Sequence, residues 1–528
     1  MAAFLPAALA GNAGAKEKAP KNDGNRRPNI IYIMSDDHAY QTISAYGHQL
    51  TQQAPTPNLD RIAKEGMLFN RAFVENSIST PSRACLMTGL YSHQSGQVGF
   101  GPDLDPSKVF FSELLQQNGY QTAVVGKWHL ECEPKGFDYY RIVGGQGDYY
   151  NPAFRTKESE GKYIKEEGYA TTLITDYSLD FIENRDPDKP FCMLIHHKAP
   201  HRSWWPEEKY LELYEDLDFP LPETFYDDYS TRCSAAANQE MSIGKDMTMI
   251  YDLKVAELLY TEEFRHEGNG GGMLSGLGRM TPEQRSRWVR SYFPRNMAFM
   301  DSQLTGDDLL RWKYQRYVKD YLRCIKSVDD QVGRVLDYLK ESGLDDNTIV
   351  IYTSDQGFYM GEHGWFDKRF MYEESFRTPL LVRYPGHIEP GTVSDALVQN
   401  IDYAPTLLSL AGVAKPAEMS GRSFEPLFKG KTPKDWRTDL YYHYYEFPAE
   451  HAVRRHDGVR TDRYKLIHFY GTTLPNDDPN YNCNELYDLQ QDPNEVNNLC
   501  GDPRYTEVQK DLQARLDKYR RDLKITEY

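Results

Sequence analysis

A short apolar run that ends in polar residues recurs along the chain, and this repetition constrains the fold more than any other feature. The runs span Asn29 to Asp37, Thr122 to His129, Phe191 to His201, Thr348 to Gly357 and Pro379 to Gly386. Continuous apolar runs of this length are typical of strands that are buried on both faces. Helical spacing separates them, as in Thr56 to Phe69 and the long amphipathic stretch Leu310 to Ser342. The alternation predicts an α/β fold with a mostly parallel sheet covered by helices on both faces.

The polar residues that end four of these runs form a candidate site. They are Asp36, Asp37, Lys127, His129, His201, Asp355 and Gln356. In open α/β sheets the ligand site lies beyond the carboxyl ends of the strands. A strand that simply ends in a polar turn explains any one of these groups, but it explains all four poorly.

These side chains suit metal-assisted chemistry on an anion. The acids and the amide offer only hard oxygen ligands, which favour Ca²⁺ or Mg²⁺ over zinc. Lys127 supplies a cation, and His129 and His201 are possible proton carriers. A divalent cation, basic side chains and a nucleophile together make a device for transferring a phosphoryl or sulfuryl group.

A nucleophile could come from the stretch SISTPSRACLMTGLYSHQSG, residues 77–96. Pro81 suits the first turn of a helix, where free backbone N–H groups attract an anion. Arg83 adds a planar fork of donors that matches an oxyanion. Ser79 then lies at the mouth of an anion site. The simpler interpretation is that Ser79 or Thr80 only caps the helix.

Chain length and residue pattern predict the domain organisation. A chain of 528 residues is longer than one that folds around a single ordinary hydrophobic core. From about residue 430, polar and aromatic residues alternate as in antiparallel strands, and a helix over Thr506 to Lys524 closes the chain. We therefore expect a catalytic domain at 28–429 and a small C-terminal α+β subdomain at 430–528. The segment 225–308, which contains GNGGGMLSGLG, is predicted to be an irregular insertion near the site mouth.

The start of the chain and the overall charge restrict location and partners. Residues 1–27 are rich in small residues and then polar, which predicts the remnant of a secretory signal peptide and a linker, and hence a periplasmic or secreted protein; the alternative is a disordered end. A formal charge of −17 argues against nucleic acid as a partner. No window approaches the roughly 18 apolar residues of a membrane span.

The cysteines indicate little about disulfides or metal sites. Seven are scattered along the chain, without a metal-binding or disulfide framework. Cys483 and Cys500 bracket a short segment, and we consider them a possible disulfide pair.

The chain resembles the sulfatase family in two long signatures. Ser79 to Gly89 follows the pattern C/S-x-P-S-R-x-x-x-L/M-T-G at every defined position, and Gly119 to His129 follows the second signature. The Asp pair after the first strand, the APH that ends at His201 and the late ELYDLxxDPxExxNL also match. The resemblance covers Pro28 to about Tyr519. It implies an alkaline-phosphatase-like fold, with a large mixed, mostly parallel sheet sandwiched by helices.

This resemblance implies that Ser79 is the precursor of formylglycine, made by a maturation enzyme; serine is the bacterial form. One hydroxyl of the hydrated aldehyde attacks sulfur, with Asp355 helping to deprotonate it, and His201 protonates the leaving alcohol. His129 then deprotonates the second hydroxyl, which expels sulfate from the sulfated enzyme. A plain serine lacks that second hydroxyl.

The resemblance also implies the ligands of the site. One Ca²⁺ is held by Asp36, Asp37, residue 79, Asp355 and Gln356. Gln356 stands where many members have Asn, and it keeps the carbonyl oxygen on a longer arm. Arg83 steadies the hydrated formylglycine, and Lys127 and Lys368 bind sulfate oxygens.

Four less specific segments look closer to N-acetylglucosamine-6-sulfatases than to arylsulfatases. They are GFDYYRIVGGQGDYYNPAF, APHRSWWP, DKRFMYEESFRTPLLVRYPG and NIDYAPTLLSLAG. We therefore expect removal of the 6-O-sulfate of N-acetylglucosamine or glucosamine in heparan-type or mucin-type glycans. The alternatives are another sugar sulfate (of uronic acid, galactose or an algal polysaccharide), a phosphodiesterase or phosphonate hydrolase of the same superfamily, and a non-catalytic glycan binder.

Candidates for sugar binding lie beside the catalytic residues. Asp367 and Arg369 flank Lys368 and are expected to reach sugar hydroxyls. Trp204 follows His201 and either stacks on the sugar or belongs to the core. In the small subdomain, one residue of a basic group is expected to touch the substrate, and His456 is the candidate. The others in this group are His443, Arg454 and Arg455.

Overall fold

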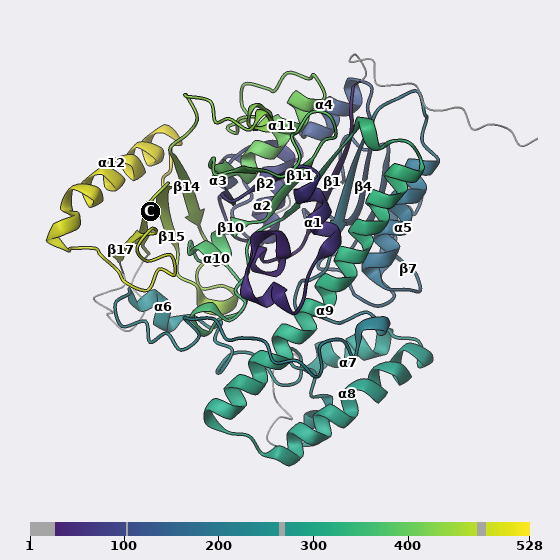
Figure 1. Cartoon of the computed structure of the whole chain (residues 1–528), viewed down its shortest axis with the longest axis vertical. Helices are drawn as coiled ribbons and strands as arrows, with labels where there is room; N and C mark the ends of the chain where they lie inside the picture. Colours follow the sequence, from purple (N-terminus) through teal and green to yellow (C-terminus); the bar gives the residue numbers. More distant parts are fainter. Residues whose placement is uncertain (1–26, 102–103, 263–269, 472–481) are drawn as a thin grey trace, which may run out of the picture.

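The computed structural model describes residues 27–101, 104–262, 270–471 and 482–528. A ten-stranded sheet with the order β12-β2-β11-β9-β1-β8-β4-β5-β6-β7 forms its centre (Figure 1). The middle of the sheet is parallel and consists of β9 (Thr348–Ser354), β1 (Asn29–Ser35), β8 (Phe191–His197), β4 (Gln121–Lys127) and β5 (Tyr139–Val143). Mixed pairing flanks it in β12 (Thr392–Ser394), β2 (Met67–Phe69), β11 (Leu380–Arg383), β6 (Ala153–Thr156) and β7 (Ile164–Lys165).

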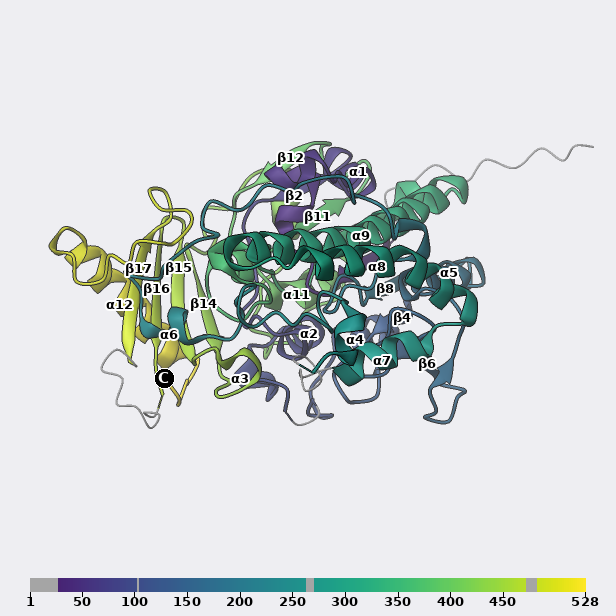
Figure 2. The same cartoon turned by 90° about the horizontal axis from the view of Figure 1, so that it is seen from below.

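Helices cover both faces of this sheet, as predicted (Figure 2). Along β1, Ile31 and Ile33 belong to one core cluster, while Ile30 and Tyr32 belong to the other, because successive side chains point to opposite faces. The first face carries α1 (Pro57–Lys64), α5 (Ala170–Glu183) and α9 (Gly306–Glu341). The second carries α2 (Ser79–Thr88), α4 (Phe111–Gln117) and α11 (Tyr403–Leu410).

Two predicted elements differ in the structure. The helix expected over Thr56 to Phe69 ends at Lys64, and the chain continues as β2. Gly66 makes this turn against β11, where a Cβ would lie 2.2 Å from the Val382 carbonyl oxygen. The second difference is the segment 225–308, which is less irregular than predicted. It contains α6 (Ser234–Asn238), α7 (Gly270–Arg279) and α8 (Pro282–Ser302), although residues 263–269 lie outside the described part.

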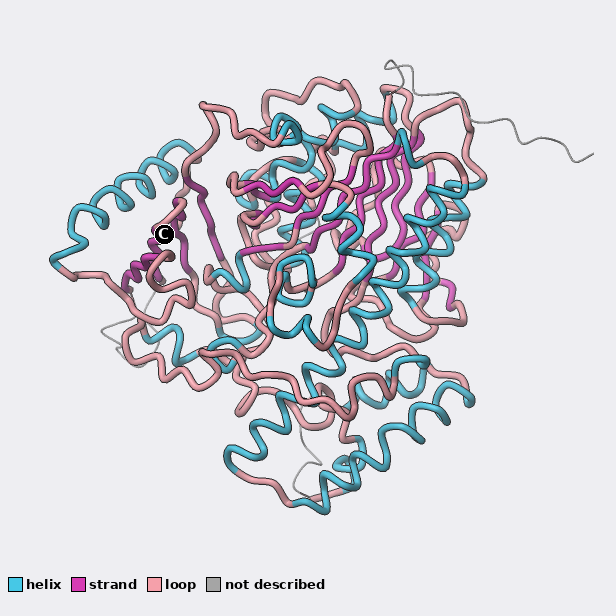
Figure 3. Tube along the Cα trace, in the orientation of Figure 1, coloured by secondary structure: helices cyan, strands magenta, loops and turns pink. Residues whose placement is uncertain are grey.

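A separate antiparallel sheet of four strands follows the central domain, as predicted (Figure 3). Its strands are β14 (Asp439–Tyr444), β15 (His456–Thr461), β16 (Tyr464–Phe469) and β17 (Cys483–Asp488). The last helix, α12 (Thr506–Asp522), packs Leu512 and Leu516 against Val459 and Leu466 of this sheet. A third, small sheet has the order β10-β3-β13 and consists of β10 (Arg377–Thr378), β3 (Ala72–Phe73) and β13 (Val398–Gln399). Two short helices are α3 (Ser92–Ser95) and α10 (Glu373–Phe376).

The proposed Cys483–Cys500 disulfide is wrong. Cys483 bonds to Cys233, with 6.2 Å between the Cα atoms, and Cys500 is a free thiol. The Leu499 N–H donates to the Leu486 carbonyl at 2.8 Å, so the returning chain meets β17 beyond Cys483. Three residues along a strand place Cys483 roughly 10 Å away from that point. Among the helices of the described residues, none is both long and apolar enough to span a membrane.

Candidate active site

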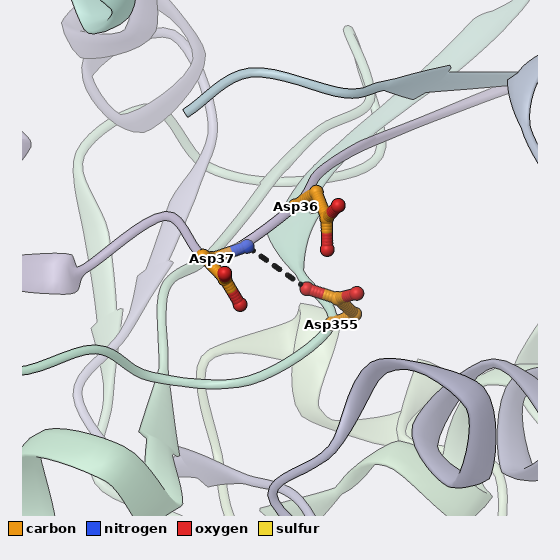
Figure 4. Close-up of side chains that lie close together, drawn as sticks. All are labelled: Asp36, Asp37 and Asp355. Atoms are coloured by element: carbon orange, nitrogen blue, oxygen red, sulfur yellow. Dashed lines mark hydrogen bonds between the residues drawn. The ribbon is translucent and has the colours of Figure 1, made fainter. Parts of the chain in front are cut away.

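The parallel pairing of β1 and β9 brings the acids together. Ser35 lies opposite Ser354, so the residues that follow each strand emerge at the same edge of the sheet. There the Asp37 N–H donates to Asp355 Oδ1 at 3.1 Å (Figure 4). Each of Asp36, Asp37 and Asp355 offers a carboxylate oxygen, and these oxygens lie within 4.8 Å of one another. Like charges this close in a buried site require positive partners.

Three basic side chains supply that compensation. Lys127 Nζ bonds to Asp36, Lys368 Nζ bonds to Asp37, and Arg83 donates to Asp355 Oδ2 from Nε at 3.2 Å and Nη2 at 3.0 Å. All six side chains are buried. The site thus holds equal numbers of acids and cations in a region without bulk water, where electrostatic interactions are strong.

The acid–cation contacts separate the pKa values of the carboxyls. Burial alone would raise the pKa of Asp36, but Lys127, His201 and Arg83 hold it well below its usual range. Burial and the neighbouring charge of Asp36 raise the pKa of Asp355 to about 7. Burial lowers the pKa of Lys127, whereas the attraction of Asp37 outweighs burial and raises that of Lys368.

Ser79 is the first residue of α2 and points into this group. Its Oγ donates to Asp36 Oδ1 at 3.0 Å and accepts from Gln356 Nε2 at 3.3 Å. Ser77 and Ser82 instead donate to the backbone carbonyls of Ser375 and Asp355. Of these three serines, only Ser79 hydrogen-bonds to a carboxylate of the buried acids.

The two candidate imidazoles lie at the edge of the site. His201 Nε2 is 3.8 Å from Asp37 Oδ2, and its Nδ1 donates to the Arg202 carbonyl at 2.7 Å. His129 Nδ1 lies 3.5 Å from Thr80 Oγ1. Burial and Lys127 lower the pKa of both rings, to about 2 for His129 and well below the usual range for His201. Burial therefore favours the neutral form of both rings.

The ligand set fits a hard divalent cation. Asp37 Oδ2 and Gln356 Oε1 are buried acceptors for which the described residues supply no hydrogen-bond donor. Buried polar atoms are normally satisfied, and these two lie among carboxylate oxygens. An all-oxygen site of this kind suits Ca²⁺ or Mg²⁺.

A second polar group, which we call the Asp367 cluster, includes the two chain neighbours of Lys368. It consists of Asp367, Arg369, Glu450 and His451. Asp367 bonds to Arg369 and lies 3.3 Å from His451 Nε2, and Arg369 Nη2 is 3.5 Å from Glu450. Glu450 and His451 were not predicted from the sequence. They lie in the loop between β14 and β15, and no local pattern distinguishes them from an ordinary polar loop.

Two expected sugar contacts are not supported by the structure. Trp204 is fully buried, and the Tyr317 ring lies 4.6 Å from it between centroids, so its faces belong to the core. His456 is also fully buried in β15. Its Nε2 accepts the Met371 N–H at 3.1 Å and its Nδ1 donates to the Arg454 carbonyl at 2.7 Å, which leaves neither nitrogen for a ligand.

Family models and a curated relative match most of the chain. The family described as sulfatase matches residues 28–413, and the C-terminal family of N-sulphoglucosamine sulphohydrolase matches residues 361–522. An N-acetylglucosamine-6-O-sulfatase from Bacteroides thetaiotaomicron is 46% identical over 96% of this chain and 88% of its own length.

Solved structures show the same fold. One protein, in complex with its substrate D-glucosamine-2-N,6-O-disulfate, superposes with a TM-score of 0.88 at 46% identity, over 95% of this chain and 99% of that one. A phosphonate monoester hydrolase of Agrobacterium radiobacter has a TM-score of 0.66 at 20% identity, covering 94% and 96% of the two chains, and shares the fold alone.

Proposed function

The chain belongs to the sulfatase family of sulfuric ester hydrolases, and on that premise we propose that it removes the 6-O-sulfate of N-acetylglucosamine or glucosamine in heparan-type or mucin-type glycans. The observation that carries the proposal is the position of Ser79, which touches Asp36 inside a buried set of paired acids and cations. The B. thetaiotaomicron relative, and the relative bound to a 6-O-sulfated glucosamine, support the choice of sugar and position.

Two groups complete the site in this proposal. Asp36, Asp37, Asp355, Gln356 and residue 79 would hold Ca²⁺, which supplies a Lewis acid. A maturation enzyme would convert Ser79 to formylglycine, whose hydrated aldehyde supplies the attacking hydroxyl. The composition of residues 1–27 supports export to the periplasm or the outside of the cell, and the domain limits 28–429 and 430–528 remain our prediction.

The charge balance explains how the residues bind a sulfate ester. The three acids and three cations of the site cancel. A bound divalent cation would give the site a net positive charge, which attracts an anionic ester. Lys127 and Lys368 then have a second acceptor in the sulfate oxygens, while Arg83 stays fixed on Asp355 and on the Lys127 carbonyl at 2.7 Å.

Proton transfer is divided between the two imidazoles. His201 has 16% of its side chain exposed, so it is accessible to a leaving sugar oxygen. Its Nδ1 proton is held by the Arg202 carbonyl, so the proton that it would give to this oxygen is one first taken up from solvent at Nε2. His129 lies beside Thr80, next to residue 79, and would take a proton from the nucleophilic residue in the second half of the reaction. The Asp367 cluster borders Lys368 and would bind hydroxyl groups of the same sugar.

Parallel assays of matured enzyme test the proposal. We expect sulfate release from N-acetylglucosamine-6-sulfate, with little from N-acetylglucosamine-3-sulfate and none from a phosphodiester. Preference for the 3-sulfate would refute the position, and preference for the phosphodiester would refute the reaction class. Arg369→Gln should raise KM for the sugar sulfate and leave hydrolysis of a small aryl sulfate less affected, because the aryl group has no hydroxyls for this residue to bind.

A further inference from the structure

A cavity of about 180 Å³ adjoins the turn that carries His201. Lys198 and Arg202 line it on either side of that turn, and the His201 N–H donates to the Lys198 carbonyl at 3.0 Å. Tyr149 also lines it, and its hydroxyl donates to the His201 carbonyl at 2.6 Å. The cavity and the proposed leaving-group acid therefore share a wall.

The lining carries an excess of positive charge. Lys198, Arg202 and Arg279 face a single acid of the lining, Asp148. Arg202 is held by Asp252 and Arg279 lies 3.1 Å from Asp148, but Lys198 has no ion-pair partner among the described residues. Lys198 is 5% exposed, donates to the Gln146 carbonyl at 3.0 Å and lies over the Tyr149 ring. A buried ammonium without a counter-ion is costly, and an anion in the cavity would remove that cost.

Gln146 connects this cavity to the catalytic cations. Its side-chain oxygen accepts from Lys127 and its backbone carbonyl accepts from Lys198. Lys127 and Lys198 therefore lie on two sides of one residue. Burial, followed by the like charge of Lys127, lowers the pKa of Lys198 to about 8. A sugar that places its sulfate on Lys127 has another part of the same molecule within reach of Lys198.

The outer wall is built by α7, which lies beside α8 below α9 in Figure 1. A Cβ at Gly276 would lie 2.6 Å from the Trp205 ring, and one at Gly272 would lie 2.7 Å from the Tyr251 ring. These glycines let the helix lie close against the aromatic floor. Arg279, at the end of α7, donates to the Asn151 carbonyl at 2.8 Å and is thereby held at the rim.

We infer that this cavity is a subsite for a second anionic group of the substrate, a sulfate or a carboxylate on the desulfated sugar or on its neighbour. The inference rests on the proposed function. It implies that the enzyme prefers 6-O-sulfated sugars that carry a further negative charge over those that carry one sulfate alone.

The test compares three substrates in matured wild-type enzyme and two variants, Lys198→Met and Arg279→Gln. The substrates are N-acetylglucosamine-6-sulfate, glucosamine-2-N,6-O-disulfate and a disaccharide of 6-sulfated N-acetylglucosamine with a uronic acid. The control is Lys189→Met, which removes an exposed lysine at the opposite end of β8. The measured quantity is kcat/KM for each dianionic substrate divided by kcat/KM for the monosulfate.

We expect each variant to lower this ratio about tenfold, mainly through KM, and the control to leave it unchanged. A fall with the disulfate identifies an N-linked sulfate as the bound group, and a fall with the disaccharide identifies a carboxylate. If the wild-type enzyme hydrolyses the monosulfate and neither variant changes either ratio, the subsite is wrong and the proposed function stands. If the wild-type enzyme hydrolyses none of the three, the proposed function fails instead.

Discussion

Asp37 donates its backbone N–H to the carboxylate of Asp355 at 3.1 Å, although 318 positions separate the two residues. The bond links the ends of two neighbouring parallel strands. It fixes the spacing of the acids before any metal arrives, and the cations around them keep the group stable.

Ser79→Ala should abolish sulfate release, because the residue is the proposed precursor of the nucleophile. The matched control is Ser112→Ala, which removes a buried serine in the first turn of α4 whose Oγ donates to the Lys135 carbonyl at 2.7 Å. The control should lose about 1 kcal/mol of stability and keep its activity. A mass spectrum of the Ser79 peptide from active enzyme should show the loss of two hydrogens. Full activity in Ser79→Ala would contradict the assignment.

Removal of the proposed Ca²⁺ with a chelator should lower both activity and thermal stability. A ligand that binds only the folded protein stabilises it by about 3 kcal/mol at a hundredfold excess over its Kd. Adding Ca²⁺ to chelated enzyme should therefore raise Tm, and Asp37→Asn should weaken that rise. Asp320→Asn is the control. Asp320 is a buried acid of α9 that pairs with Lys254 and is none of the proposed ligands, and its substitution should keep the Ca²⁺ response. A wild-type Tm that is indifferent to chelator and Ca²⁺ would argue against the metal.

The buried pair Asp457–Arg520, which fixes α12 on β15, should make stability depend on acidity. Burial would raise the pKa of Asp457, but the hydrogen bonds from Arg520 lower it to about 2. A carboxyl whose pKa is lower in the folded state stabilises above its unfolded pKa, and this stabilisation is lost as the pH falls from about 4 to about 2.

Asp457→Asn should therefore lower the free energy of unfolding by about 2 kcal/mol or more at pH 7, and the difference from wild type should shrink near pH 2. Urea unfolding at several pH values measures this. Asp511→Asn, which breaks the largely exposed pair with Arg515 on the same helix, should change stability by less than about 1 kcal/mol. An equal effect of the two substitutions would show that the Asp457 bond does not anchor the helix.

The disulfide between Cys233 and Cys483 ties α6 to β17. Peptide mapping without reduction should recover these two cysteines in one linked fragment. Cys483→Ser should lower stability by about 2 to 5 kcal/mol and make it insensitive to reductant. Cys500→Ser, which alters a free thiol, should behave as wild type. A linked fragment that contains Cys500 would overturn the pairing.

The sequence by itself determined the parts of the protein that local pattern encodes. Apolar runs that end in Asp36, Lys127, His201 and Asp355 revealed the strands and the edge at which their ends meet, because parallel strands place their carboxyl ends together. Family signatures then singled out Ser79 among neighbouring serines. The distant Lys368 also came from a family motif, and no periodicity would have found it.

Only the tertiary structure decided the residues whose roles depend on packing. Trp204 and His456 are residue types that often contact sugars, but in this fold both side chains are fully buried by their neighbours. His451 reaches Asp367 because one loop of the C-terminal sheet folds over the central domain. The glycine-rich α7 is a poor helix by propensity, yet it forms a cavity wall because its glycines fit against Trp205 and Tyr251. Sequence periodicity reports which face of an element is buried, whereas contacts between distant segments arise only when the whole chain has packed.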